Sequence, residues 1–130
     1  MKYKLGFPIV FSALIVTFSF TNSFARQDLK ASWYSVQSLK DEGTWKTSHG
    51  KMANGKQFRD EKFTAAARWY PLGTTLRIIN TENEKTVIVV VTDRISKRFA
   101  TKRIDLSKSA FASIADLKQG LISIKVEVIS

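Results

Sequence analysis

Two aspartates carry the clearest chemical signal in this sequence. Asp93 follows the apolar run Val87–Thr92, and Asp105 ends a second, shorter apolar segment. A carboxyl group beside a buried strand is costly unless it is paired, hydrogen-bonded or at the rim of a cleft. At a cleft rim, such a group can work as a general acid or base. The alternative is structural, with each acid capping a turn or pairing with its neighbour, Arg94 or Arg103.

Aromatic and basic residues could bind a ligand next to these acids. The segment Trp45–Gly55 is rich in glycine and lysine and lacks a strand period, which predicts a long basic loop. Tryptophans are concentrated in the first half of the sequence, and flat indole rings suit the apolar faces of sugars, although burial in the core competes with that role for each. The predicted ligand-binding set is Trp33, Tyr34, Trp45, His49, Lys51, Asn54, Trp69 and Arg94.

Metal and thiol chemistry are not expected. His49 is the only histidine, so a zinc site built from several histidines is excluded, and a Ser-His-Asp triad has one available base. The sequence contains no cysteine, which excludes thiolate catalysis, disulfides and a lipoprotein anchor. We therefore expect no metal and no cofactor.

The elements that position the aspartates are mostly strands. Segments 30–35, 74–80 and 85–92 have strand character, and residues 81–84 form a hairpin in which Asn83 is expected to be left-handed. The segment Ile122–Val128 alternates strictly between apolar and polar side chains, which predicts one buried and one exposed face. One short helix is predicted before it, with Ser107 as N-cap, an apolar stripe through residue 117 and Gly120 in the following turn. Small β domains of this size usually close into barrels.

The N-terminus predicts export. Lys2 and Lys4 precede the apolar stretch Leu5–Phe20, and small residues before residue 26 suit a signal peptidase, so residues 1–25 are interpreted as a signal peptide. An uncleaved anchor is the alternative, although the stretch is short for a membrane span. Residues 26–130 then form one domain with nineteen Lys and Arg against eleven Asp and Glu, a net charge of +8. Such a domain favours anionic envelope polymers over nucleic acid. We expect a monomer in the bacterial periplasm or cell envelope, without a membrane span after cleavage.

Six blocks of sequence follow one another over nearly all of residues 26–130. They are Lys30–Tyr34, Met52–Gly55, Phe63–Ala66, Pro71–Thr74, Val89–Arg94 and Arg103–Ser107. In their sequence and order they resemble the RlpA-like (rare lipoprotein A) family, whose double-psi β-barrel is similar to the first domain of expansins. The resemblance implies a six-stranded double-psi β-barrel whose cleft binds β-1,4-linked glycans, and an endolytic peptidoglycan lytic transglycosylase activity.

The resemblance assigns functional positions one at a time. Asp93 matches the Asp of the family's Asp-Arg-Gly turn, and Asp105 matches the essential acid of the related expansin motif. The family commonly has Glu after Ala-Asn-Gly and His after Thr-Ala-Ala, both linked to cleavage, where this chain has Lys56 and Ala67. Ile95 replaces the Gly of the turn, and the peptidoglycan-binding repeat domain of many relatives is expected to be absent.

The predicted function is that of an exported domain acting on wall glycan. Asp105 is interpreted as the general acid, and Asp93 as the charge that stabilises the oxocarbenium-like transition state. Loss of the Glu and His equivalents leaves a second hypothesis, a non-catalytic, expansin-like module that binds or loosens wall polysaccharide. A third hypothesis is a secreted effector or inhibitor that uses the barrel as a scaffold for protein contacts. The sequence does not specify the glycan, its length or any protein partner.

Overall fold

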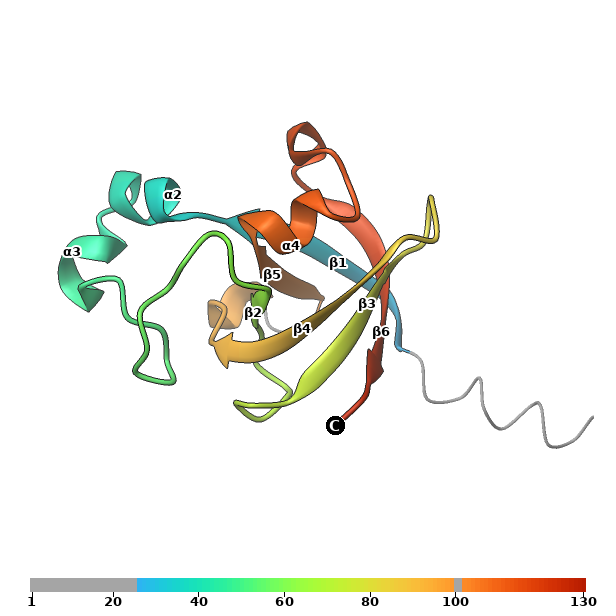
Figure 1. Cartoon of the computed structure of the whole chain (residues 1–130), viewed down its shortest axis with the longest axis horizontal. Coiled ribbons are helices and arrows are strands. Elements are labelled where there is room, and N and C mark those ends of the chain that lie inside the picture. Colours follow the sequence, from blue (N-terminus) through green and yellow to red (C-terminus); the bar gives the residue numbers. More distant parts are fainter. Residues whose placement is uncertain (1–25, 100–101) are drawn as a thin grey trace, which may run out of the picture.

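The computed structural model describes residues 26–99 and 102–130, so the predicted signal peptide lies outside the described residues. Six strands form a closed barrel in the order β1-β5-β2-β4-β3-β6 (Figure 1). Closure pairs every strand on both sides, which removes exposed sheet edges. The predicted six-stranded barrel is confirmed. The strands are β1 (Arg26–Tyr34), β2 (Thr64–Ala66), β3 (Thr75–Asn80), β4 (Thr86–Asp93), β5 (Arg103–Ser107) and β6 (Ile122–Val128).

The barrel core follows the period-two pattern of the strands. Val87, Val89 and Val91 on β4 are buried, whereas Ile88 and Val90 between them are partly exposed on the outer face. Strand β6 buries Ile122, Ile124 and Val126 in the same way, as predicted from its sequence, whereas Val128 at its end is 59% exposed. Burial of these branched side chains from all six strands fills the barrel, so its interior is a packed core.

In the described residues, three short α-helices accompany the strands, where the sequence predicted one. They are α2 (Val36–Asp41), α3 (Thr44–Ser48) and α4 (Lys108–Ala112), with 3-10 turns η2 (Lys97–Phe99) and η3 (Leu117–Gln119). Helices α2 and α3 lie together at one end of the barrel, away from the β3–β4 hairpin (Figure 1). Within the described residues, no helix is both long enough and apolar enough to span a membrane.

Two local predictions were wrong in an informative way. The segment predicted to be a loop from Trp45 onward begins inside helix α3. The preceding helix α2 starts with a capping box at Ser35, and Gly43, in a left-handed conformation, connects the two helices by a tight turn. In the hairpin, Glu84 takes the positive φ of 63°, not Asn83. The Asn83 side chain instead accepts from the Lys85 amide and donates to the carbonyl oxygen of Ile114.

The helix predicted after β5 is confirmed at its start and is shorter than expected. Ser107 is the N-cap of α4, and its hydroxyl accepts from the Ala110 amide at 3.4 Å. The regular helix ends at Ala112, and Asp116 then caps the separate turn η3. Gly120 ends this turn with a φ of 69°.

Candidate functional site

Four neighbouring strands place one row of side chains at one end of the barrel. Ser32 on β1 is in register with Asp105 on β5, and Asp105 is in register with Ala66 on β2. Ala66 is also in register with Asp93 on β4. Since paired strands lie about 4.8 Å apart, the Cα atoms of the two aspartates are separated by two strand spacings, about 10 Å. The small side chain of Ala66 forms the floor between them.

An irregularity in strand pairing turns Asp93 toward this row. Ala65 pairs with Val91, but the next residue, Ala66, pairs with Asp93, so Thr92 is an extra residue in β4. In a regular strand Asp93 would share the face of Val91, which points into the core. The bulge therefore places the Asp93 carboxylate outside the core, which is a recurrent use of bulges beside active sites.

Both aspartates line a single groove with a volume of about 620 Å³. Its walls come from β1, α2, the residues around Gly50 and the segment from Arg94 to Phe99. Asp93 and Asp105 therefore face the same groove. Their charges are matched by basic groups on the same walls, so the groove is polar at its base.

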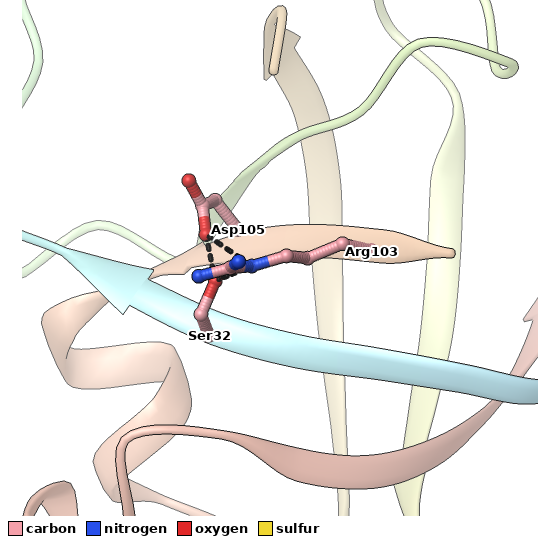
Figure 2. Close-up of polar contacts among 3 residues, drawn as sticks. All are labelled: Ser32, Arg103 and Asp105. Atoms are coloured by element: carbon pink, nitrogen blue, oxygen red, sulfur yellow. Dashed lines mark hydrogen bonds and ion pairs between the residues drawn. The ribbon is translucent and has the colours of Figure 1, made fainter. Parts of the chain in front are cut away.

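Asp105 is held by two residues from neighbouring positions in the barrel (Figure 2). Ser32 Oγ donates a hydrogen bond to Asp105 Oδ1, and Arg103 Nε lies 3.9 Å from the same oxygen. Arg103 Nε also donates to Ser32 Oγ at 2.8 Å, which fixes the hydroxyl between the two charged groups. The other carboxylate oxygen of Asp105 points away from both partners (Figure 2). Asp105 is thus anchored through one oxygen, and the residue lines the groove.

Burial raises the pKa of Asp105 above its ordinary value of 3.8. The Ser32 hydrogen bond and the Arg103 charge oppose this shift, and the Asp93 charge adds to it. The net upward direction means that the cost of burying the charge exceeds the stabilisation from its two partners. Asp105 is therefore the carboxyl group in this groove that is suited to hold a proton.

Asp93 accepts three hydrogen bonds. Its Oδ1 accepts from the Ala53 amide at 3.0 Å and the Arg94 amide at 2.9 Å, and its Oδ2 accepts from the Tyr34 hydroxyl at 3.2 Å. The Tyr34 ring stacks on Phe58 with ring centroids 4.4 Å apart. Burial, and then the Asp93 charge, raise the pKa of Tyr34, so its hydroxyl keeps its proton and remains a donor. These contacts orient the Asp93 carboxylate as an acceptor.

The alternative roles of the two aspartates, capping a turn or helix and pairing with Arg94 or Arg103, are only partly supported. Helix α4 is capped by Ser107, so Asp105 is not its N-cap. Asp105 does form the expected ion pair with Arg103. The Arg94 guanidinium donates to the carbonyl oxygens of Ala67 and Tyr70, so it ties two loops together instead of pairing with Asp93.

Four of the predicted ligand-binding residues line the groove. They are Trp33, Tyr34, Lys51 and Arg94. Trp33 also packs against the barrel core, and its indole N–H donates to the Leu117 carbonyl oxygen at 3.0 Å. Of these four residues Lys51 is the most exposed, so its side chain can change conformation to contact a ligand.

The other four lie elsewhere. Trp45 packs over Gly50 so closely that a Cβ added there would lie 2.5 Å from the indole. His49 is exposed at the end of α3, with a left-handed φ of 55°. Asn54 lines a second pocket on the other side of its loop, and Trp69, 41% exposed, lies at a small pocket near Ile104.

Sequence reasoning did not identify Ser32, which binds Asp105, or the groove-lining residues Ala66 and Phe99 as part of the site. Ser32 and Ala66 become site residues only through strand register, which leaves no local signal. Phe99 is 37% exposed at the groove, with the Arg103 guanidinium 4.4 Å from its ring centroid. A lone aromatic residue in a basic segment could have indicated this contact.

Among the residues that the structure describes, no group of three or more His, Cys, Asp or Glu side chains could hold a metal ion. The polar groups at the two aspartates are their carboxyl groups, the Ser32 and Tyr34 hydroxyls and the Arg103 guanidinium.

Comparison with known proteins assigns the family. The family model described as "Lytic transglycolase" matches residues 26–126, which include β1 to β5, most of β6 and both groove aspartates. The chain belongs to the lytic transglycolase family. It is an RlpA-like double-psi β-barrel.

Relatives and structural neighbours agree with this assignment. The endolytic peptidoglycan transglycosylase RlpA of Rickettsia bellii is 38% identical over 99 residues, covering 75% of this chain and 40% of that protein. An uncharacterised protein of Synechocystis is 38% identical over 76 residues, which is 58% of this chain and 79% of the relative. The chain thus spans well under half the length of the RlpA protein it matches.

The fold itself recurs in solved structures. A Streptomyces papain inhibitor aligns with a TM-score of 0.62 and 21% identity, over 82% of this chain and 94% of the inhibitor. A Clavibacter michiganensis expansin in complex with cellohexaose aligns with a TM-score of 0.59 and 18% identity, over 80% of this chain and 50% of the expansin. At these identities the likeness concerns the fold alone.

Proposed function

We propose that this family member is an exported peptidoglycan lytic transglycosylase that cleaves β-1,4-linked wall glycan from within the strand. The observation that carries the proposal is the state of Asp105, a groove-lining carboxyl group with a raised pKa that is anchored through one oxygen while the other points away from Ser32 and Arg103. A single acid in this condition is the minimum that the reaction requires. The RlpA relative supports the choice of peptidoglycan as substrate.

In the proposed mechanism Asp105 acts twice. Protonated Asp105 first gives its proton to the glycosidic oxygen as the bond from that oxygen to C1 breaks. The resulting carboxylate then accepts the proton of the sugar's C6 hydroxyl, whose oxygen attacks C1 and closes a 1,6-anhydro ring. One proton is donated and one is recovered, so the enzyme returns to its starting state without consuming water.

Asp93 has a supporting role in this mechanism. Its carboxylate is fixed by three hydrogen bonds and shares the groove with Asp105. A fixed negative charge beside the reacting ring stabilises the positive charge that develops at C1. The Tyr34 hydroxyl sets the direction of one Asp93 oxygen, so Tyr34 is a positioning residue in this proposal.

The test is digestion of purified peptidoglycan, with mass analysis for 1,6-anhydro products. Asp105→Asn keeps the size and hydrogen bonding of the side chain but removes the transferable proton, so product formation is expected to fall by about 10² or more. Glu82→Gln, in the hairpin away from the groove, is the matched control and should leave the rate unchanged. Wild-type protein that releases no anhydro product between pH 4 and pH 8 would refute the enzymatic assignment.

A non-catalytic, expansin-like wall-binding module is the second candidate function. Two substitutions favour it, since Ala67, at the family's His position, is buried with 2% exposure, and Lys56, at the Glu position, lines a second pocket. Neither residue supplies an acid to the groove. This function predicts that the protein pellets with insoluble wall and that Asp105→Asn pellets equally well, with no soluble product from either form.

Export is part of the proposal. The basic, then apolar, N-terminal sequence is that of a signal peptide, and peptidoglycan lies outside the inner membrane. Sequencing the N-terminus of protein recovered from the periplasm should give Arg26 as the first residue. An intact Met1 on protein in the cytoplasmic fraction would contradict this prediction.

A further inference from the structure

Arg103 contacts both the candidate acid and the hydroxyl beside it, and the proposed mechanism does not yet use it. Arg103 and Asp105 are two residues apart on β5, so their side chains leave the same face of the strand. On the neighbouring strand β1, Lys30 is in register with Arg103, and Ser32 is in register with Asp105. The Ser32 hydroxyl therefore lies within reach of both side chains, and the three groups form a triangle of contacts (Figure 2).

The hydrogen bonds in this triangle run in one direction. An arginine side chain donates and cannot accept, so Arg103 Nε donates to Ser32 Oγ, at 2.8 Å. A serine hydroxyl has a single proton, and Ser32 donates it to Asp105 Oδ1. Because Oδ1 is occupied as an acceptor, the proton of the neutral acid belongs on the other oxygen, Oδ2, which points away from both partners (Figure 2).

Arg103 acts on the carboxyl group through the hydroxyl and through its charge. Its Nε is 3.9 Å from Asp105 Oδ1, which is too far for a hydrogen bond, so Ser32 is the link between them. Arg103 is also held from the other side. Its guanidinium carbon lies 4.4 Å from the ring centroid of Phe99 on turn η2, a distance at which an aromatic ring attracts a cation. The direction of the Ser32 hydroxyl is therefore set by a side chain that is itself fixed.

We propose that Arg103 is a positioning residue that acts through Ser32 to keep the transferable proton of Asp105 on Oδ2. This inference rests on the proposed function, in which Asp105 is the general acid. With Arg103 in place, the acid gives its proton from Oδ2 to the glycosidic oxygen and recovers one there from the C6 hydroxyl, while Oδ1 keeps its hydrogen bond from Ser32. Without Arg103, the hydroxyl is free to rotate and either oxygen of Asp105 can carry the proton.

A double-mutant cycle tests whether Arg103 acts through Ser32. Arg103→Met keeps the length of the side chain but removes its charge and donors, and turnover at the pH optimum should fall about tenfold with KM unchanged. Ser32→Ala should lose about as much, and adding Arg103→Met to it should cost nothing further. Arg103 also lines the groove, so direct contact with glycan is the competing role. Losses that multiply in the double variant, or a loss confined to KM, would overturn the proposal.

The matched control is Arg98→Met. Arg98 is exposed on turn η2, and its guanidinium carbon lies 5.2 Å from the Phe99 ring centroid, but it does not line the groove. This variant loses the same charge beside the same ring and should keep its turnover. Rates are normalised to folded protein by chemical unfolding of every variant.

NMR titration of the Asp105 side-chain carboxyl carbon gives a readout that does not need catalysis, with the signal assigned by its loss in Asp105→Asn. The Ser32 hydrogen bond and the Arg103 charge both favour the charged form, so the pKa of Asp105 should be higher in Ser32→Ala and in Arg103→Met than in wild type. Arg98→Met should leave it close to the wild-type value. The other ionisable or charged side chains that line the groove are unchanged in these variants, and they are Tyr34, Glu42, Lys51, Asp93 and Arg94.

The two readouts separate this inference from the proposed function. A general acid must be protonated, so the alkaline limb of the pH–rate profile should move to higher pH in the same two variants whose Asp105 titration moves. An Asp105 titration that Arg103→Met leaves unchanged would overturn the proposal. If no form of the protein releases anhydro product while the titration moves as expected, the transglycosylase assignment fails, and the control of Asp105 by Arg103 stands.

Discussion

Replacing Asp105 by asparagine should stabilise the protein at neutral pH while abolishing its proposed activity. The pKa of Asp105 is raised, so burying its charge costs more free energy than its contacts with Ser32 and Arg103 recover. Each unit by which the pKa is raised corresponds to about 1.4 kcal/mol. Asparagine is neutral at every pH and retains an acceptor for Ser32, so the variant avoids this cost.

The sign with pH follows from linkage. The pKa of Asp105 is higher in the folded state than in the unfolded state. Protonated Asp105 therefore contributes its full share to the free energy of unfolding below the unfolded-state pKa, and this share is lost as pH rises through the folded-state pKa. Wild type and Asp105→Asn should therefore be equally stable near pH 3. Their free energies of unfolding should diverge toward pH 7, with the variant more stable.

Chemical unfolding across this pH range is the assay, with Glu82→Gln as control. For a domain of this size, 1 kcal/mol corresponds to a change in Tm of about 4–8 °C, well above measurement error. The Asp105 side chain is 27% exposed, so solvent does not remove the effect. A variant that is less stable than wild type at pH 7 would refute the reasoning, because it would show that the ion pair with Arg103 at 3.9 Å outweighs burial.

Three further predictions concern single features. Tyr34→Phe keeps the stacking on Phe58 but removes the hydrogen bond to Asp93, so turnover should fall about tenfold with a stability loss of about 1 kcal/mol, measured by parallel digestion and unfolding. Gly50→Ala should lower the free energy of unfolding by about 1–3 kcal/mol, because the added Cβ would collide with Trp45 and the φ of Gly50 is +74°. Gly55→Ala is the control, and it should lower the free energy of unfolding by less, since no atom obstructs a Cβ there. Pelleting with wall sacculi should weaken markedly between low salt and about 0.3 M salt, and a salt-insensitive affinity would contradict an electrostatic contribution.

The parts of the fold that sequence predicts are those with local signals. The alternation through Ile122–Val128 specifies a strand with one buried face, and Ser107 before an apolar stripe specifies a helix start. Helix α2 went unnoticed although Ser35 is a good N-cap, because a helix of six residues has too few periodic positions to stand out. Short elements depend on tertiary contacts, which a single sequence does not show.

Of the candidate site, the sequence predicted the two acids and four residues of the groove lining, Trp33, Tyr34, Lys51 and Arg94. Asp93 and Asp105 were identified by their place beside apolar strands, but the row that joins them depends on register. Ser32 lies 73 residues before Asp105, and no local pattern indicates that pairing. No sequence pattern predicts the bulge at Thr92 either, although this bulge is the reason that Asp93 faces the groove and not the core.

The long sequence separations in this site have a consequence for when the protein becomes active. The contacts that build it join residues 73, 59 and 40 positions apart, through strands that meet only in the closed barrel. Such non-local pairings form late and slowly in folding, because closing a long loop costs chain entropy before the stabilising contacts can form. A partly folded chain therefore has neither an oriented acid nor a groove. The wall-cleaving activity proposed for this protein would therefore be absent until the barrel is complete.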